Sequence, residues 1–268
     1  MTSSTTPISS MPTSPSGPWP PSGPAPTNDA RAMGVGRPSK RAGGVAALTA
    51  AATFIFGIGL FATSLQDYTT GDPTPQESVA FLVGHQGTLF LWYLVILLVF
   101  GAALVPLVLS LHRNLRPRTP RLADAGAVFG AMWAALMFAT GMIANVGITA
   151  VADLAGNDLD RAATVWATID VVTDGLGGGN ELVGGTWVLL VSLAALRNRA
   201  LPRALNVLGL LCAGCGLLTV VPGLSDLGMG FGLGLIVWFI GVGVALLRSD
   251  GIDRQAANAL GSRTRSGC

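Results

Sequence analysis

Six apolar blocks, each close to the length of a membrane span, follow one another along the chain with short polar loops between them. A helix needs roughly 20 apolar residues to cross a bilayer. The blocks are too long for strands and lack the alternation of a strand, so helices are the economical way to satisfy their backbone in lipid. We therefore predict an all-α fold, a polytopic membrane protein with six transmembrane helices. The blocks are residues 45–63, 88–111, a stretch within 123–152, 182–196, 204–221 and 227–247.

The composition supports a membrane protein. Hydrophobic residues make up 50% of the chain and charged residues 11%, whereas a soluble domain carries about 25% charged residues. The net charge of +2 is small, so we expect membrane lipids and no nucleic acid among the partners. Arginine is far commoner than lysine, and alanine and glycine are abundant, which is typical of a bacterial protein from a GC-rich genome.

The basic residues predict the orientation, because short loops rich in lysine and arginine stay in the cytoplasm. With six spans, every basic residue except Arg161 falls on the same side as the two termini, and most acidic residues fall on the other. We therefore expect a multi-pass protein of the cell (plasma) membrane, with the N- and C-termini cytoplasmic.

The two ends of the chain are predicted to lie outside the membrane domain. Residues 1–44 are rich in proline, serine and threonine and lack the pattern of a signal peptide. Such a segment buries too little apolar surface to fold, so we expect a disordered cytoplasmic tail. The transmembrane domain is assigned to residues 45–249, and residues 250–268 to a short cytoplasmic tail.

The loop after the third block contains a predicted amphipathic helix. Asn157 or Asp158 is suited to cap it, apolar residues recur at intervals of three and four up to Val172, and Gly175 is suited to end it. We expect this helix to lie on the outer membrane surface, with Trp166 at the level of the headgroups.

The main candidate site follows this helix, where three glycines at 177–179 precede Asn180 and Glu181. Glycines allow backbone shapes that other residues avoid, and an ionisable residue at the mouth of a helical bundle is a candidate ligand or ion site. A hinge between the surface helix and the fourth span explains the same residues, and both interpretations are open here.

Two other polar residues lie close to or inside the third block. Asn145 completes the candidate polar site, although a hydrogen bond to another helix would also explain it. Asp124 lies three residues after Arg121, so we expect these two side chains to pair at the cytoplasmic interface.

Metal and redox chemistry are not expected. His85 and His112 fall on opposite sides of the membrane, and a metal site needs several ligands that converge. Cys212 and Cys215 lie among leucine, alanine and glycine, which suits packing better than thiol chemistry. We predict no catalytic, cofactor-binding or metal-binding residues, and no cofactor.

Glycine pairs at helical spacing are typical of close contacts between helices in lipid. The pairs Gly126 with Gly130 and Gly228 with Gly232 would suit either a tightly packed single bundle or a homo-oligomer.

The last third of the chain carries an ordered set of features: a polar entry, a Gly-Trp pair, an arginine hairpin and a proline at a helix end. The residues are Asn180, Glu181, Gly185, Trp187, Leu201, Pro202, Arg203, Gly209 and Pro222. In this order they resemble an uncharacterised bacterial six-helix membrane family, domain of unknown function 4386, over about residues 177–247. The resemblance implies a six-helix membrane protein without an assigned activity, and it carries over no catalytic residue.

Three classes of function stay open. A non-enzymatic structural or regulatory role is the leading expectation, because ionisable residues deep in the spans are scarce. A small-solute transporter or channel with an outward-facing site near Glu181 is the alternative. A membrane-embedded enzyme acting at the outer face is the second alternative, and it would need clustered acid–base or metal residues.

Overall fold

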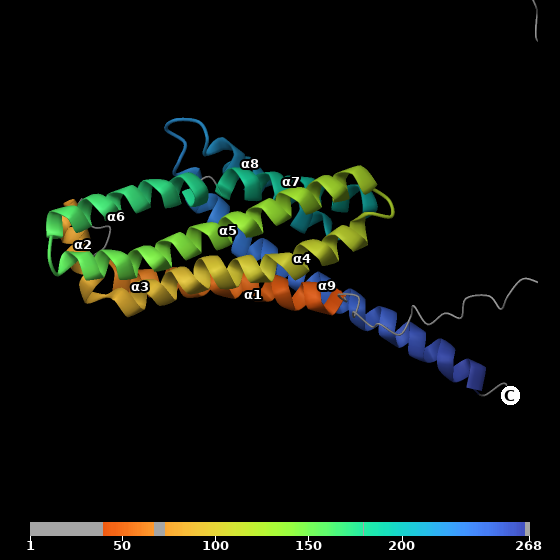
Figure 1. Cartoon of the computed structure of the whole chain (residues 1–268). Helices are drawn as coiled ribbons and strands as arrows, with labels where there is room; N and C mark the ends of the chain where they lie inside the picture. The colour runs from red at the N-terminus through yellow and green to blue at the C-terminus, as the bar shows by residue number, and fades with distance from the viewer. Residues whose placement is uncertain (1–39, 67–72, 179, 266–268) are drawn as a thin grey trace, which may run out of the picture. The chain divides into compact units, whose positions relative to one another are not determined.

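The computed structural model describes residues 40–66, 73–178 and 180–265, and every regular element within these ranges is a helix (Figure 1). Three short π-helical segments, labelled η, continue α-helices. In chain order the elements are α1 (Lys40–Leu60), η2 (Phe61–Leu65), α2 (Pro75–Gly84), α3 (Gln86–Tyr93), η4 (Leu94–Val99), α4 (Phe100–Leu115), α5 (Pro120–Ala155), α6 (Leu159–Thr173), η5 (Asp174–Gly178), α7 (Asn180–Asn198), α8 (Arg203–Leu218) and α9 (Leu227–Arg265).

The prediction of an all-α polytopic membrane protein is confirmed. In the described ranges, five helical segments are long and apolar enough to cross a membrane: Lys40–Leu65, Gln86–Leu115, Pro120–Ala155, Leu159–Asn198 and Leu227–Gly251. The remaining apolar block forms α8, which has 16 residues and is therefore about 24 Å long. A helix of this length is shorter than the roughly 30 Å hydrocarbon core.

An aromatic cluster forms the centre of the bundle. The indoles of Trp133, Trp187 and Trp238 and the rings of Phe100 and Phe239 are at most 2% exposed. Neighbouring rings in this cluster pack with centroids 5.1–6.4 Å apart, and many of them meet edge to face, the favourable geometry for aromatic pairs. Because these residues come from α4, α5, α7 and α9, the cluster connects four of the apolar segments.

The helix α5 is longer than the hydrocarbon core of a bilayer is thick. Its 36 residues span about 54 Å, well over the hydrocarbon thickness of about 30 Å. The helices α2 and α6 pack against this end of α5, and Figure 1 shows α6 and α7 succeeding one another along α5. We call this region, formed by α2, α6 and the C-terminal end of α5, the α6 end of the bundle.

The predicted amphipathic helix exists as α6, but its apolar face packs on protein. Asp158 caps it by accepting a hydrogen bond from the backbone N–H of Arg161 at 3.0 Å. Trp166 is 2% exposed and belongs to a second apolar cluster that includes Val79 and Val151. Trp166 therefore packs on protein and not among lipid headgroups as expected, because the C-terminal end of α5 and the helix α2 cover the indole.

The opposite end of the bundle, which we call the arginine end, contains the α4–α5 and α7–α8 loops. The side-chain amide of Asn198 donates hydrogen bonds to the Leu115 carbonyl oxygen at 2.9 Å and to Thr119 Oγ1 at 3.1 Å. Arg118 Nη1 in turn donates to the Asn198 carbonyl oxygen at 3.0 Å. These bonds fasten the end of α7 to the loop between α4 and α5.

Parts of the two predicted tails belong to the first and last helices. Of the predicted N-terminal tail, residues 1–39 lie outside the described residues, and the last five form the first turns of α1. The short C-terminal tail predicted after residue 249 continues α9, which runs to Arg265.

Candidate functional site

A cavity of about 290 Å³ lies within the transmembrane bundle, between α1, the segment α3–η4–α4, α5, α7 and α9. Its wall is almost entirely apolar and rich in aromatic rings. The residues that line it are Phe54, Gly57, Ile58, Trp92, Ile96, Leu97, Phe100, Trp133, Met137, Glu181, Gly228, Phe231 and Gly232. Of these residues, Glu181 alone is ionisable.

Glu181 lies in the first turn of α7 and is half-buried. Its Oε2 atom is buried and has no hydrogen-bond partner among the residues that the structure describes. The indole Nε1 of Trp133, on the same cavity wall, is likewise buried without a partner. Two residues of the wall therefore each hold a buried polar atom without a partner among the described residues, in otherwise apolar surroundings.

Two glycines bring neighbouring helices close to Glu181. A Cβ atom added to Gly216 of α8 would stand 2.7 Å from the Glu181 carbonyl oxygen, so a side chain there would push α8 away from α7. A Cβ atom added to Gly228 of α9 would stand 3.6 Å from Glu181 Oε1, an ordinary contact. The absence of a side chain at Gly228 leaves space beside Oε1.

The other side of the cavity is held by Trp92. Its indole Nε1 donates a hydrogen bond of 3.0 Å to the carbonyl oxygen of Gly57 in α1. Ile96 and Leu97 of the π-helix η4 follow Trp92 in the same wall. Single-turn π-helical segments inside α-helices are rare and are often found at functional sites.

Comparison with protein families decides the membership of the chain. The family model described as "Domain of unknown function (DUF4386)" matches residues 42–247. The chain belongs to this family. The match covers the first half of the membrane domain as well as the part in which the resemblance was seen. The comparisons with curated proteins and with solved structures found no match.

Of the other two members of the polar site predicted for this DUF4386 chain, only the side chain of Asn145 is described by the structure. Asn180 begins α7, but its side chain lies outside what the structure describes. Asn145 is buried in α5 and is not part of the cavity wall. Its Oδ1 has no hydrogen-bond partner in the described ranges, so the expected bond to another helix is not made by this oxygen.

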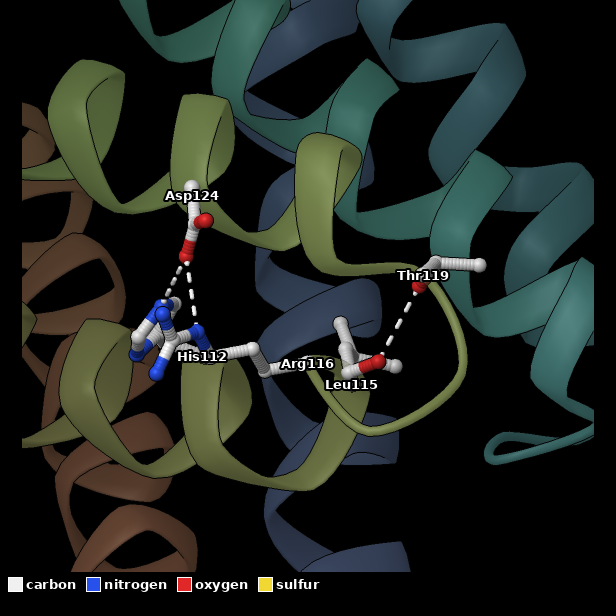
Figure 2. Close-up of polar contacts among 5 residues, drawn as sticks. All are labelled: His112, Leu115, Arg116, Thr119 and Asp124. Atoms are coloured by element: carbon white, nitrogen blue, oxygen red, sulfur yellow. Dashed lines mark hydrogen bonds and ion pairs between the residues drawn. The ribbon is translucent and has the colours of Figure 1, made fainter.

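Asp124 pairs with residues other than the expected one. Its Oδ1 accepts hydrogen bonds from His112 Nε2 at 2.8 Å and from Arg116 Nε at 3.1 Å (Figure 2). The prediction of a pair with Arg121 is wrong, because α4 and α5 form a hairpin that brings the last turns of α4 opposite the first turn of α5. The cluster joins these two helices and lies at the arginine end, opposite to Glu181.

The remaining candidates do not form a chemical site. In the described part of the chain, no group of three or more histidine, cysteine, aspartate or glutamate side chains is placed to hold a metal ion. Cys212 and Cys215 are free thiols, and Cys212 Sγ packs against Gly234 of α9. An open groove of about 800 Å³ lies between α2 and α6, but its Gln76 and Asp160 are exposed and bond each other at 3.1 Å.

The four glycines proposed for an oligomer contact lie against other helices of the same chain. Gly126 faces Leu190 and Val191 of α7, and Gly130 faces Val108 and Trp187; on α9, Gly228 faces Glu181 and Gly232 faces Phe54. These contacts account for the pattern within one bundle, and association of two copies through the same glycines stays a prediction.

Proposed function

We propose that this DUF4386 protein binds a small solute inside its membrane domain, and that the cavity beside Glu181 is the binding site. The observation that supports this proposal is the buried, unpartnered Oε2 of Glu181 at an apolar cavity wall. An uncompensated charge in a bundle is costly, and membrane proteins retain such residues chiefly at substrate or ion pathways.

The size and lining of the cavity favour binding over catalysis. Ligand sites are typically concave and apolar, from about 300 Å³ upward, with a few polar groups that orient the ligand, and the 290 Å³ cavity is at the small end of that range. An acid–base or metal mechanism needs several cooperating groups, whereas the residues lining this cavity include a single ionisable side chain.

Transport of the solute is the second candidate, and the backbone before α7 favours it. The π-helix η5 (Asp174–Gly178) directly precedes the helix that carries Glu181. Gly175 within it has no neighbouring atoms within 4 Å of an added Cβ. A loosely packed, irregular segment of this kind is suited to absorb a change in helix angle, as a transporter requires.

We further infer that the protein resides in the cell membrane with both termini in the cytoplasm. The support is the charge of the loops, since the basic residues of the α4–α5 and α7–α8 loops lie at the arginine end. Glu181 and Gly228 begin α7 and α9 at the other end of these helices. In this orientation the cavity lies nearer the outer face.

The test is to fill the cavity. A Cβ added to Gly232 would meet one atom within 4 Å, Phe54 Cε1 at 3.8 Å, so Gly232→Leu fits its first carbon and extends into the cavity. Thermal melts of the detergent-purified chain are recorded with increasing benzyltrimethylammonium and, separately, its uncharged analogue neopentylbenzene. A ligand of the folded state raises the melting temperature in a saturable way.

Gly214→Leu is the matched control, because a Cβ at Gly214 in α8 meets nothing within 4 Å and Gly214 is not at the cavity wall. We expect at least one probe to stabilise the wild type and Gly214→Leu but not Gly232→Leu. Stabilisation of none of the three, or of all three alike, would contradict the proposed site.

A further inference from the structure

We infer that the solute is a compact organic cation, an ammonium group carried on an apolar body. This inference rests on the proposed function and specifies the chemistry of the ligand. The cavity combines two features that recognise such a molecule: a carboxylate whose Oε2 has no hydrogen-bond partner among the described residues, and a wall rich in aromatic rings.

The carboxylate of Glu181 has no cationic partner in the described part of the chain. No basic residue lines the cavity, and the basic side chains of the two loops gather at the arginine end. A neutral apolar ligand would remove water from this carboxylate without replacing the lost interactions, which is unfavourable. A cationic ligand would supply the missing charge inside the cavity.

The aromatic wall is continuous. The ring of Phe54 lies 5.2 Å from that of Phe100, Phe100 lies 5.1 Å from Trp133, and Trp133 lies 6.4 Å from Phe231, each measured between ring centroids. Ring faces attract ammonium groups, most strongly when water is excluded, and aromatic cages of this kind recognise quaternary ammonium ions.

A metal cation fits the cavity less well than an organic one. Calcium takes six to eight oxygen ligands and magnesium about six, whereas Glu181 contributes the only carboxylate of the wall. The half-buried rings of Phe54 and Trp92 offer no oxygen, but they do offer apolar surface for the organic part of an ammonium ion.

The test compares two molecules of the same shape that differ in charge. Benzyltrimethylammonium and neopentylbenzene are titrated against the full chain in dodecyl maltoside, a detergent without charge, and affinities are taken from the saturation of the melting temperature. We expect the wild type to prefer the cation by at least about tenfold, because the cation is attracted to the ring faces and to the carboxylate whereas the neutral analogue is not.

Glu181→Gln keeps the shape of the side chain and removes its charge. It should weaken the cation by about tenfold or more and leave the neutral analogue within about twofold. Asp153→Asn is the control, since Asp153 is exposed near the end of α5. This substitution changes the net charge of the chain by the same amount and leaves the cavity unchanged. If Glu181→Gln does not fold, Gly228→Ala replaces it, because the added methyl group stands beside Glu181 Oε1 and should weaken the cation more than the analogue.

The outcomes separate this inference from the proposed function. Equal affinities of the wild type for the two probes, or a preference that Glu181→Gln leaves unchanged, would overturn the cation inference. The site itself would still be supported if Gly232→Leu alone loses binding. Binding of neither probe would overturn both. Displacement of the cation by added phosphatidylethanolamine, but not by phosphatidylglycerol, would assign the ammonium group to a lipid headgroup, and no displacement by either would assign it to a free solute.

Discussion

The side-chain amide of Asn198 lies 2.9 Å from the carbonyl oxygen of Leu115, which joins the last turn of α7 to the end of α4. Asn198 is 6% exposed, and the same amide also donates to Thr119 Oγ1 at 3.1 Å. These bonds help to fix the loop geometry at the arginine end, together with the bond from Arg118 Nη1 to the Asn198 carbonyl oxygen.

Replacing this side chain should destabilise the fold. Asn198→Ala removes two hydrogen bonds of about 1 kcal/mol each and leaves the Leu115 carbonyl oxygen without this donor, so we expect the free energy of unfolding to fall by about 2–3 kcal/mol. Unfolding by a denaturing detergent measures the change. Asn157→Ala, at an exposed position, should change the same quantity by less than about 0.5 kcal/mol, and equal effects at both positions would contradict the role of Asn198.

Glycine at position 130 is required by close packing. A Cβ there would overlap Val108 Cγ2 and stand 2.7 Å from Trp187 Nε1, so Gly130→Ala should lower the free energy of unfolding by about 1–3 kcal/mol. Gly214→Ala, which meets no atom within 4 Å, should leave stability unchanged or raise it by up to about 1 kcal/mol, since alanine is the better helix former. A loss of stability at Gly214 as large as that at Gly130 would show that the packing argument is wrong.

The start of α2 should contribute stability that depends on pH. Thr74 and Glu77 form a capping box in which the Thr74 backbone N–H donates to Glu77 Oε2 at 2.7 Å. The backbone and side-chain hydrogen bonds from Thr74 lower the pKa of Glu77 below its ordinary value of 4.5. A lowered folded-state pKa contributes stability that is present above the unfolded pKa and is lost as the pH falls through the folded pKa.

Glu77→Gln removes this titration and keeps a side chain that can cap. The melting temperature of the wild type should therefore exceed that of the variant most at neutral pH, and the difference should shrink as the pH falls below about 4.5. Melting curves recorded between pH 3 and pH 7 measure it. A difference that stays constant or grows towards low pH would show that the carboxylate makes no such contribution.

The elements that a local pattern encodes could be predicted from the sequence. The apolar blocks form helices because a helix satisfies the backbone hydrogen bonds within its own segment. The helix α2 was not predicted, although Thr74, Pro75 and Glu77 form a local start signal of the capping-box type. Recognition of this signal would have revealed the helix.

Features that depend on distant residues could not be predicted in this way. The pattern of α6 shows an apolar face, but it does not say whether lipid or protein covers Trp166. The spacing of Arg121 and Asp124 suggested a pair, yet the hairpin places His112 and Arg116 closer. The cavity has walls from five segments, and its aromatic residues resemble ordinary core residues in the sequence. Glu181 was found because it is an ionisable residue beside an apolar block.

The proposed orientation rests on loop charge and is open to a direct test. A reporter fused after Arg116 or Arg199 should indicate the cytoplasm, and one inserted at Asn157 should indicate the exterior. Enzymatic and fluorescent reporters that are active on only one side give the result. The same side for Arg199 and Asn157 would exclude a membrane crossing by α7 and with it the six-span topology.

Photolabelling tests the central claim, solute binding in the Glu181 cavity, most directly. A diazirine derivative of benzyltrimethylammonium is activated by light on the purified chain, with and without excess unlabelled benzyltrimethylammonium, and labelled peptides are located by mass spectrometry. We predict that the labelling removed by the competitor lies in the cavity-lining stretches, residues 54–58, 92–97 and 228–232. Two results would contradict binding in the cavity. One is labelling that the competitor reduces only at outward-facing positions such as Val146 or Val237, which are 70% and 59% exposed. The other is labelling that the competitor never reduces.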